Sequence, residues 1–529
     1  MMTPGHFTMS ALTRLLERLA LRPLAAADAL GNRLYGSRFN PLYQSGTIVV
    51  ALYLVLLVTG LWLLIFYRVG APWESVARLT GNPWWGNWVR GLHRYASDLA
   101  VIATAVHALR MFAQARSWGA RAHAWMTGCV LLLLLFFCGW TGYVMVWDTF
   151  GELLAREGAR LIDAMPFLSE PMGRAFTGEQ PVRTAFFFVN LFAHVGIPLG
   201  MGVVFWLHVR RLQRPALLPP PGVTWAVVGL LVAAAIVWPL SMAPRGDPLT
   251  LAAEIPVDLF FAFWIPAARP LGGGQALIVA AGLGLGLLAA PWLTARRGAA
   301  APQPSVVDES ICVGCVQCSL DCPYGAITMF PRESRRSDLV ARVDPDLCVS
   351  CGICSGSCPP MGVGPPGRTG RDQMAAVREF LARPERRRGE IVAIYCGHGA
   401  GAYAADLAAA GGVPYPVDCG GNLHSSIVEM LLREGAAGVI VLACPPRDCW
   451  HREGPKWLDQ RVYHEREAEL HARVDRSRVR IVGVNVRERT VAIDALRRFA
   501  ADVNALAPPR EAMPAIEATC EPPLAGRES

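Results

Sequence analysis

The chain has 529 residues and a formal net charge of +8, and 53% of its residues are hydrophobic. Long apolar runs dominate residues 46–294, whereas residues 300–529 are polar and hold 13 of the 15 cysteines. The arginines that supply the positive charge are scattered or flank apolar runs, as membrane-interface anchors do, which argues against nucleic-acid binding. The sequence therefore predicts a membrane part followed by a soluble part.

Residues 1–45 show no short apolar core before a small-residue cleavage site, so they are not expected to be a secretory signal. The stretch FTMSALTRLLERLALRPL alternates apolar and basic residues with helical period, which predicts an amphipathic helix on the cytoplasmic membrane surface. Six later segments are long enough to cross a bilayer, which takes about 20 residues. They lie near 46–67, 93–115, 125–147, 185–209, 223–243 and 274–294.

Four histidines form two pairs with the same spacing in the second and fourth apolar segments. His93 and His107 are fourteen residues apart, as are His194 and His208. Fourteen residues make about four helical turns, so each pair shares one helix face with roughly 21 Å between its members. Two such helices give two stacked histidine pairs, and the group that fits between the members of a stacked pair is a haem held on both sides. The alternative, unrelated histidines bonded to neighbouring helices, gives no reason for the spacing to repeat.

Two glycine pairs repeat this spacing in the first and third apolar segments. Gly46 and Gly60 are fourteen residues apart, as are Gly128 and Gly142. Glycine is common in membrane helices, so one pair alone would carry little weight. Only glycine lets a backbone approach a haem edge closely. Two matching pairs therefore predict a four-helix cage around two haems.

These residues resemble cytochrome b of the quinol-oxidising cytochrome bc and b/f complexes. The resemblance covers about residues 40–295 and includes the four histidines and the four glycines. It also rests on VRGLHRYAS at 89–97, GYVMVW at 142–147, and Pro198 four residues after His194. The resemblance implies two b-type haems and a quinone as the reaction partner.

In that family the second and fourth helices run in the same direction. The resemblance therefore pairs His93 with His194 near the outer face and His107 with His208 on the cytoplasmic side. It places two glycines at each haem: Gly60 and Gly142 at the first, Gly46 and Gly128 at the second. Three arginines could meet the propionates of the first haem or act as interface anchors: Arg90, Arg94 and Arg183.

The chain departs from the family at two places. The family usually has Pro-Trp where this chain has Val146-Trp147. The family's quinol-oxidation site carries Pro-Glu-Trp-Tyr, and residues 256–259 here read Pro-Val-Asp-Leu instead. Asp258 is a candidate replacement for the glutamate as proton acceptor, or an ordinary loop carboxylate. A conventional bifurcating quinol-oxidation site is therefore not expected, while a quinone site at the other haem stays open.

A predicted linker at residues 296–308 follows the last apolar segment, where TARRGAAAPQPS is basic and then rich in Ala and Pro. Residues 309–365 then carry the spacing C-x2-C-x2-C-x3-C-P twice. In this dicluster spacing, three close thiolates bind one cluster and the fourth binds the other. The sequence predicts one 4Fe–4S cluster on Cys312, Cys315, Cys318 and Cys358, and another on Cys348, Cys351, Cys354 and Cys322. Zinc sites use two pairs of ligands and disulfides need an oxidising compartment, so both alternatives fit less well.

Residues 388–505 alternate strand-like runs with helical segments, which predicts a small α/β domain with a parallel sheet. Four of its cysteines sit at predicted strand ends, where the sites of parallel sheets gather. Over about 390–505, and most strongly in ACPPRDCWHREG, this region resembles the delta iron–sulfur subunit of methyl-viologen-reducing hydrogenase. That subunit connects hydrogenase to heterodisulfide reductase.

The resemblance implies a 2Fe–2S cluster on Cys396, Cys419, Cys444 and Cys449. The family often has a further cysteine shortly after the first, where this chain has His398-Gly399. Zinc binding and purely structural cysteines are the alternatives. Three other cysteines are expected to bind no cofactor: Cys129 and Cys138 in the membrane part, and Cys520 in the Pro-rich tail at 506–529.

The sequence as a whole predicts a membrane all-α di-haem helix bundle of about six transmembrane helices at 46–295. A ferredoxin-like α+β dicluster domain and a small α/β parallel-sheet domain follow. Iron–sulfur clusters of this kind are built in the cytoplasm, and six spans return the chain to its starting side. We therefore expect a multi-pass protein of the cytoplasmic (inner) membrane of a prokaryote, with its iron–sulfur domains facing the cytoplasm.

The expected function is electron transfer between a soluble partner and the quinone pool. No GxGxxG follows a predicted strand and opens a helix, and the hydrogenase resemblance implies a soluble heterodisulfide-reductase-like flavoprotein as that partner. One alternative is a membrane adaptor that relays electrons to another redox protein without its own quinone site. Another is a redox sensor, although the sequence shows no output domain. A homodimer is also compatible with the sequence.

Overall fold

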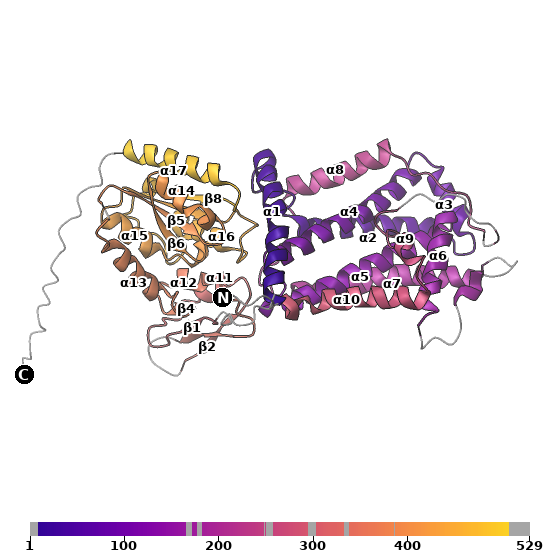
Figure 1. The fold of residues 1–529 in the computed structure, drawn as a ribbon, viewed down its shortest axis with the longest axis horizontal. Coiled ribbons are helices and arrows are strands. Elements are labelled where there is room, and N and C mark those ends of the chain that lie inside the picture. Colours follow the sequence, from indigo (N-terminus) through magenta and orange to yellow (C-terminus); the bar gives the residue numbers. More distant parts are fainter. Residues whose placement is uncertain are drawn as a thin grey trace, which may run out of the picture. The chain divides into compact units, whose positions relative to one another are not determined.

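The computed structural model describes residues 9–165, 172–176, 182–247, 249, 258–294, 303–332, 338–385 and 387–506. The chain divides into two compact units. The first unit comprises Met1–Cys351 and Pro445–Glu453, and the second comprises Gly352–Cys444 and Gly454–Ser529. Figure 1 labels the helices and strands of both. Several residues named above lie outside the described ranges: Pro256, Val257, Cys520 and most of the predicted linker.

Among the described residues, five helices are long and apolar enough to cross a membrane. They are α2 (Ser45–Phe66), α4 (Gly86–Ala113), α5 (Ala122–Val146), α7 (Thr184–Val209) and α10 (Gly273–Thr294). The predicted span at 223–243 corresponds to α8 (Pro221–Val237), which has only 17 residues. This helix ends just before Trp238-Pro239, because proline cannot supply the next backbone N–H. A sixth crossing therefore stays a prediction.

The membrane helices associate as two pairs, α2 with α4 and α5 with α7, as can be followed in Figure 1. The buried face of α4 presents Ala96, Ala100 and Ala103 to its neighbours, and Leu52 of α2 packs into the same cluster. Small residues let helix backbones approach closely, which drives helix association where lipid offers no hydrophobic contrast. Helix α8 also packs against α4, and its Ala235 contributes to the same cluster and faces Gly91.

The predicted N-terminal helix is present as α1 (Met9–Tyr35), which packs against α4 and α10. Helix α6 (Thr149–Ile162) starts at Asp148, whose side chain accepts a hydrogen bond from the Gly151 N–H. Such a cap satisfies one of the free N–H groups at a helix start. The short elements of this region are α3 (Pro72–Thr80), η1 (Gly119–Arg121), η2 (Met172–Phe176) and α9 (Ile265–Ala268).

The two cysteine-rich repeats have the same local structure. In the first unit, β2 (Ile327–Pro331) pairs antiparallel with β3 (Leu339–Val343), with Ile327 opposite Val343. The remaining elements are β1 (Val306–Val307) and α11 (Gln317–Asp321) in the first unit, and α12 (Ile353–Gly356) and β4 (Val363–Gly364) in the second. Helices α11 and α12 each begin five residues after the first cysteine of their repeat.

The described part of the second unit contains a four-stranded parallel sheet in the order β6-β5-β7-β8, which confirms the predicted α/β class. The strands are β5 (Ile391–Cys396), β6 (Gly412–Val417), β7 (Gly438–Ala443) and β8 (Val479–Gly483). Strand β7 is buried along its whole length, as expected of a parallel strand covered on both faces. The helices are α13 (Gly370–Leu381), α14 (Ala404–Ala409), α15 (Ser425–Arg433), α16 (Gly454–Tyr463) and α17 (Arg489–Asn504).

Candidate functional site

The imidazole rings of His93 on α4 and His194 on α7 face each other across the bundle. Their centroids are 6.4 Å apart, and the ring planes are inclined by 59°. A metal–imidazole bond is about 2.0 Å, and the bonded nitrogen lies about 1.2 Å from the ring centre, so two imidazoles on opposite sides of one metal have centres about 6.4 Å apart. The separation of this pair therefore fits axial ligation of one iron.

Threonine hydroxyls fix the orientation of three of the four histidines. Thr59 Oγ1 lies 2.8 Å from His93 Nδ1 and donates its own proton to the Val55 carbonyl at 2.7 Å. The hydroxyl therefore accepts from Nδ1–H and leaves Nε2 unprotonated, which is the form that binds a metal. Thr141 Oγ1 lies 3.0 Å from the Nδ1 atom of His194.

In the inner pair, His107 and His208, a hydroxyl partner is seen for His208. Thr127 Oγ1 lies 3.0 Å from His208 Nδ1 and also hydrogen-bonds to the His123 carbonyl at 2.8 Å. The two histidines are close enough for their charges to interact, and the charge of Arg110 also reaches His107. Partners of this kind on the second ring nitrogen are typical of metal-ligating histidines.

Each of the four glycines lies directly against a histidine ring. A Cβ atom at Gly46 would lie 2.9 Å from His107 Cε1, and one at Gly142 would lie 3.0 Å from His194 Cε1. The corresponding distances are 3.2 Å between Gly60 and His93 and 3.4 Å between Gly128 and His208. Sequence reasoning expected the glycines to make room for a haem edge, and the structure shows that they make room for the imidazoles.

A further regularity of the sequence was missed. Every one of these glycines follows a hydroxyl residue, in Ser45-Gly46, Thr59-Gly60, Thr127-Gly128 and Thr141-Gly142. In three of the four dipeptides the hydroxyl contacts a histidine Nδ1. These three dipeptides thus supply both the space for the ring and a partner for its nitrogen. Repetition of this dipeptide at a spacing of fourteen is the signal that could have revealed it.

Cys138 lies beside the outer pair, on the side of α5 that faces His194. Its Sγ atom is 3.9 Å from the His194 carbonyl oxygen. Pro198 lacks the N–H that would bond to this carbonyl in a regular helix, so the thiol supplies a donor where the helix lacks one. Cys129 Sγ instead lies 3.9 Å from the Leu287 carbonyl on α10.

Asp258, the predicted stand-in for the family's glutamate, has both carboxylate oxygens occupied. Its Oδ2 atom accepts from Arg94 at 2.6 Å and from the Tyr143 hydroxyl. Its Oδ1 atom accepts from the N–H groups of Phe260 and Phe261 at 2.9 and 2.6 Å. Although burial acts in the opposite direction, these hydrogen bonds and the Arg94 charge hold the pKa of Asp258 below its usual range. A carboxylate held in this way is a poor proton acceptor.

Two arginines near the outer pair have protein partners. Arg94 also forms an ion pair with Asp98, one turn further along α4. Arg90 donates a hydrogen bond to Thr80 Oγ1 at 2.9 Å. Both guanidinium groups are thus held in place by the protein itself. Their predicted role at the haem propionates stays a prediction.

The two C-x2-C-x2-C-x3-C loops repeat three backbone bends at equivalent positions. Positive φ angles occur two, four and thirteen residues after the first cysteine of each loop. The residues are Gly314, Val316 and Gly325 in the first loop, and Ser350, Gly352 and Met361 in the second. Left-handed bends turn successive N–H groups and thiols toward one centre.

Backbone amides near the cysteine loops point at the thiols. The N–H groups of Ala326 and Gly362 lie 3.3 Å from the Sγ atoms of Cys322 and Cys358, each four residues earlier in the chain. Cys322 is also within electrostatic reach of Cys348, its predicted partner in one cluster. Amide donors of this kind stabilise the negative charge of thiolates on an iron–sulfur cluster.

Three of the four cysteines predicted in the last domain lie at the carboxyl ends of parallel strands. Cys396 ends β5, Cys419 follows β6, and Cys444 follows β7. The Sγ atoms of Cys396 and Cys444 are 3.7 Å apart. Two thiolates on one tetrahedral metal with bonds of about 2.3 Å lie about 3.8 Å apart, so this pair fits a shared iron. Cys449 lies in Pro445–Glu453 of the first unit.

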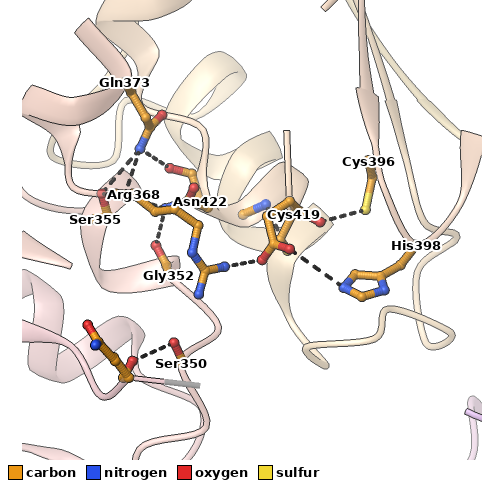
Figure 2. Close-up of polar contacts among 12 residues, drawn as sticks. Ser350, Gly352, Ser355, Arg368, Gln373, Cys396, His398, Cys419 and Asn422 are labelled. Carbon is orange, nitrogen blue, oxygen red and sulfur yellow. Dashed lines mark hydrogen bonds and ion pairs between the residues drawn. The ribbon is translucent and has the colours of Figure 1, made fainter. Parts of the chain in front are cut away.

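Figure 2 shows the polar contacts around the turn that follows Cys419. Asn422 Nδ2 donates to the carbonyls of Gly352 and Arg368, both at 3.0 Å. Gln373 Nε2 donates to the Asn422 carbonyl at 2.9 Å. This turn is therefore tied to the backbone just before α12, the helix that carries Cys354.

The fully buried Arg461 strengthens the same connection. Its guanidinium donates to Ser357 Oγ at 2.9 Å and to the Gly421 carbonyl at 2.8 Å. His424 Nε2 lies 3.2 Å from the Cys358 carbonyl. Burial and the charge of Arg461 lower the pKa of His424 to about 4, so the ring is neutral. Within the second unit, the segment with Cys419 and the segment with Cys358 thus share one hydrogen-bond network.

With this geometry in place, comparison with known proteins separates three regions of the chain. Residues 31–215 match the family model for cytochrome b/b6/petB. Residues 311–361 match a 4Fe-4S dicluster domain, and residues 391–507 match the delta subunit of methyl-viologen-reducing hydrogenase. All three predicted resemblances are confirmed.

The cytochrome b region also has a curated relative. The chain is 24% identical over 176 residues to the menaquinol:cytochrome c reductase cytochrome b subunit of Geobacillus thermodenitrificans, which covers 32% of this chain and 79% of that protein. A solved chain titled "Hyperthermophilic respiratory Complex III" is 17% identical with a TM-score of 0.37, over 47% of this chain and 75% of its own. That structural likeness is too weak to carry an argument.

These matches establish the general nature of the molecule. It is an integral membrane protein that joins a cytochrome b region to iron–sulfur domains, and it acts in electron transfer. The cytochrome b region implies haem b, and the dicluster domain implies iron–sulfur clusters. The menaquinol reductase relative associates this type of subunit with quinone chemistry.

Proposed function

We propose that the chain passes electrons between a soluble heterodisulfide-reductase-type flavoprotein and the quinone pool. The carriers would be one 2Fe–2S cluster, two 4Fe–4S clusters and two b-type haems, on the histidines and cysteines predicted above. One observation carries the proposal: the His93 and His194 rings stand at the separation of two axial ligands. Ordinary buried histidines need no partner ring at that distance.

The polar contacts between the helix ends and the dicluster region support a continuous route for electrons. Arg214, six residues after His208, donates to the Leu320 carbonyl at 2.5 Å, and the Gln213 N–H donates to the Pro323 carbonyl at 3.1 Å. Arg121 donates to the Tyr324 hydroxyl at 2.9 Å. These contacts support placing the His107/His208 haem on the side of the dicluster region around residues 320–324, which we propose is the cytoplasmic side.

The soluble partner is proposed because the sequence offers no nucleotide or flavin motif for a two-electron reaction. The match to the hydrogenase delta subunit supports a heterodisulfide-reductase-type flavoprotein in this role. Ferredoxin-type clusters tend to have low reduction potentials, so flow from the partner to quinone is the easier direction. An electron that crosses two-thirds of the membrane field along the haem pair gains or loses about 1.5 kcal/mol per 100 mV.

The decisive experiment is the reduction of the purified, detergent-solubilised protein with dithionite, followed by addition of a quinone analogue. The haem α-band and low-temperature EPR spectra would be recorded together. The proposal expects two b-haems, three cluster signals, and haem reoxidation within milliseconds to seconds. A single haem would contradict the assignment of the histidine pairs, and a full set of cofactors without reoxidation would exclude the quinone site.

A second function, a membrane adaptor without its own quinone site, is favoured by the occupied carboxylate of Asp258. Its oxygens are filled by Arg94, by Tyr143 and by backbone N–H groups. Asp258 is therefore not a free proton acceptor at the position that the family uses for quinol oxidation. The same reoxidation experiment separates the two functions.

A further inference from the structure

The loop Pro445–Glu453, called here the 445–453 loop, is held by side chains from the ends of the membrane helices. Asp448 Oδ1 accepts hydrogen bonds from Arg110 Nη2 at 2.5 Å and from Gln114 Nε2 at 2.8 Å. Arg116 Nη2 donates to the Cys449 carbonyl at 2.6 Å. The loop belongs to the same compact unit as these helices.

Further contacts secure the loop on both sides of Cys449. Arg121 donates to the Trp450 carbonyl at 3.1 Å, and Arg116 also stacks over the Trp450 ring at 5.7 Å. Arg214 forms an ion pair with Glu453 at 2.9 Å. Arginine suits such contacts because its planar group stacks and donates several bonds at once.

Arg110 is not an ordinary interface anchor, because it is only 4% exposed. Its second nitrogen donates to Asp28 Oδ1 of α1 at 2.6 Å, and its guanidinium lies 5.0 Å from the Tyr43 ring centre. A buried charge is stable only with close partners of opposite sign. Removal of Asp448 would leave Arg110 with one carboxylate instead of two.

The contacts lie next to the inner histidine pair. Arg110 follows His107 by three residues, or about 4.5 Å along the helix axis. Arg214 follows His208 by six residues on the chain leaving α7. The loop that carries Cys449 is therefore fixed at the helix ends that present both inner histidines.

We propose that Arg110, Gln114 and Asp448 form a latch that holds the 445–453 loop, and with it Cys449, next to the inner haem site. Electrons would then enter the membrane part through this loop. The inference rests on the proposed function. With both cofactors bound, one electron would pass from a reduced iron–sulfur cluster held in part by Cys449 to a ferric haem held by His107 and His208, with no bond formed or broken.

The test compares Asp448→Ala with Asp28→Ala in the full-length protein. Both variants remove one carboxylate from Arg110, but only the first touches the loop. In Asp448→Ala we expect amide hydrogen exchange in residues 445–453 to rise about tenfold, which corresponds to about 1.4 kcal/mol. We also expect slower haem reduction after photochemical reduction of the clusters, with unchanged cluster EPR. Asp28→Ala keeps the Arg110–Asp448 contact and should therefore change both measurements much less than Asp448→Ala does.

Two outcomes would overturn the proposal: unchanged exchange in Asp448→Ala, or a loosened loop with an unchanged rate of haem reduction. If Asp448→Ala does not fold, Gln114→Ala removes one of the two hydrogen bonds to Asp448 and should give the same effects at smaller size. No quinone is added in these measurements. A failure of the latch is therefore distinguishable from a failure of the quinone-coupled function, which appears only as missing reoxidation.

Discussion

Replacement of Gly46 or Gly128, which face the inner histidines, tests most directly whether the glycines make room for the imidazole rings that would hold a haem. A Cβ atom at Gly46 would lie 2.9 Å from His107 Cε1, whereas one at Gly128 would lie 3.4 Å from His208 Cε1. The first distance forces the ring to move, and the second is an ordinary contact. Both glycines serve the same predicted haem, so Gly128→Ala is a matched control for Gly46→Ala.

The two substitutions are expected to have opposite effects on the stability of the inner haem site. Alanine gains about 1 kcal/mol over glycine in helix propensity, and overpacking costs about 1–3 kcal/mol. Gly46→Ala should therefore lose or disturb the inner haem, whereas Gly128→Ala should keep it. Pyridine haemochrome analysis gives the haem content per protein, and an optical redox titration shows which haem is affected. Two unperturbed haems in Gly46→Ala would refute the reasoning.

Three further predictions follow. His194 Nδ1 lies 3.0 Å from both the Thr141 hydroxyl and the Cys138 carbonyl. Thr141→Val removes the first of these partners and should raise the midpoint potential of one haem, whereas Thr104→Val, whose hydroxyl has no hydrogen-bond partner among the described residues, should leave both potentials unchanged. Because its pKa is lower in the folded state than the unfolded value of 3.8, Asp258 stabilises the protein above pH 3.8, and this stability is lost as the pH falls below it. Calorimetry should therefore find Asp258→Asn less stable than wild type at pH 6, and a constant difference down to pH 3 would contradict this. Arg461→Met should lower the free energy of unfolding by about 3 kcal/mol, because it leaves buried hydrogen-bond acceptors unpaired. Faster amide hydrogen exchange in residues 353–358 would measure this loss. The substitution Arg497→Met, at an exposed position, is the control.

The sequence predicted those features that depend on repetition. Helix geometry alone predicted that His93 and His107, fourteen residues apart, share one helix face. The resemblance placed Gly46 at the same haem as His107, and the structure brings this glycine against the His107 ring. The parallel sheet was predictable because buried strands alternate with amphipathic helices. The length of α8 was not, because Pro239 ends the helix a few residues before the apolar run ends.

Features that depend on contacts between distant segments could not be predicted. Sequence reasoning interpreted the arginines that flank apolar runs as membrane-interface anchors, and the structure shows three of them, Arg110, Arg116 and Arg121, holding the 445–453 loop. Nothing local distinguishes an arginine at a lipid interface from one that binds a loop more than 300 residues away. The occupied state of Asp258 also depends on partners far away in the sequence, Arg94 and Tyr143.

The pairing of the membrane helices bears on how the protein is assembled. The hydroxyl–glycine dipeptides of α2 serve the histidines of α4, and those of α5 serve the histidines of α7. Each helix pair can therefore orient its own histidines before any cofactor arrives. Each proposed haem would then join one pair to the other. Insertion of haem would be the step of biogenesis that closes the bundle, and cells starved of haem should accumulate two preformed halves.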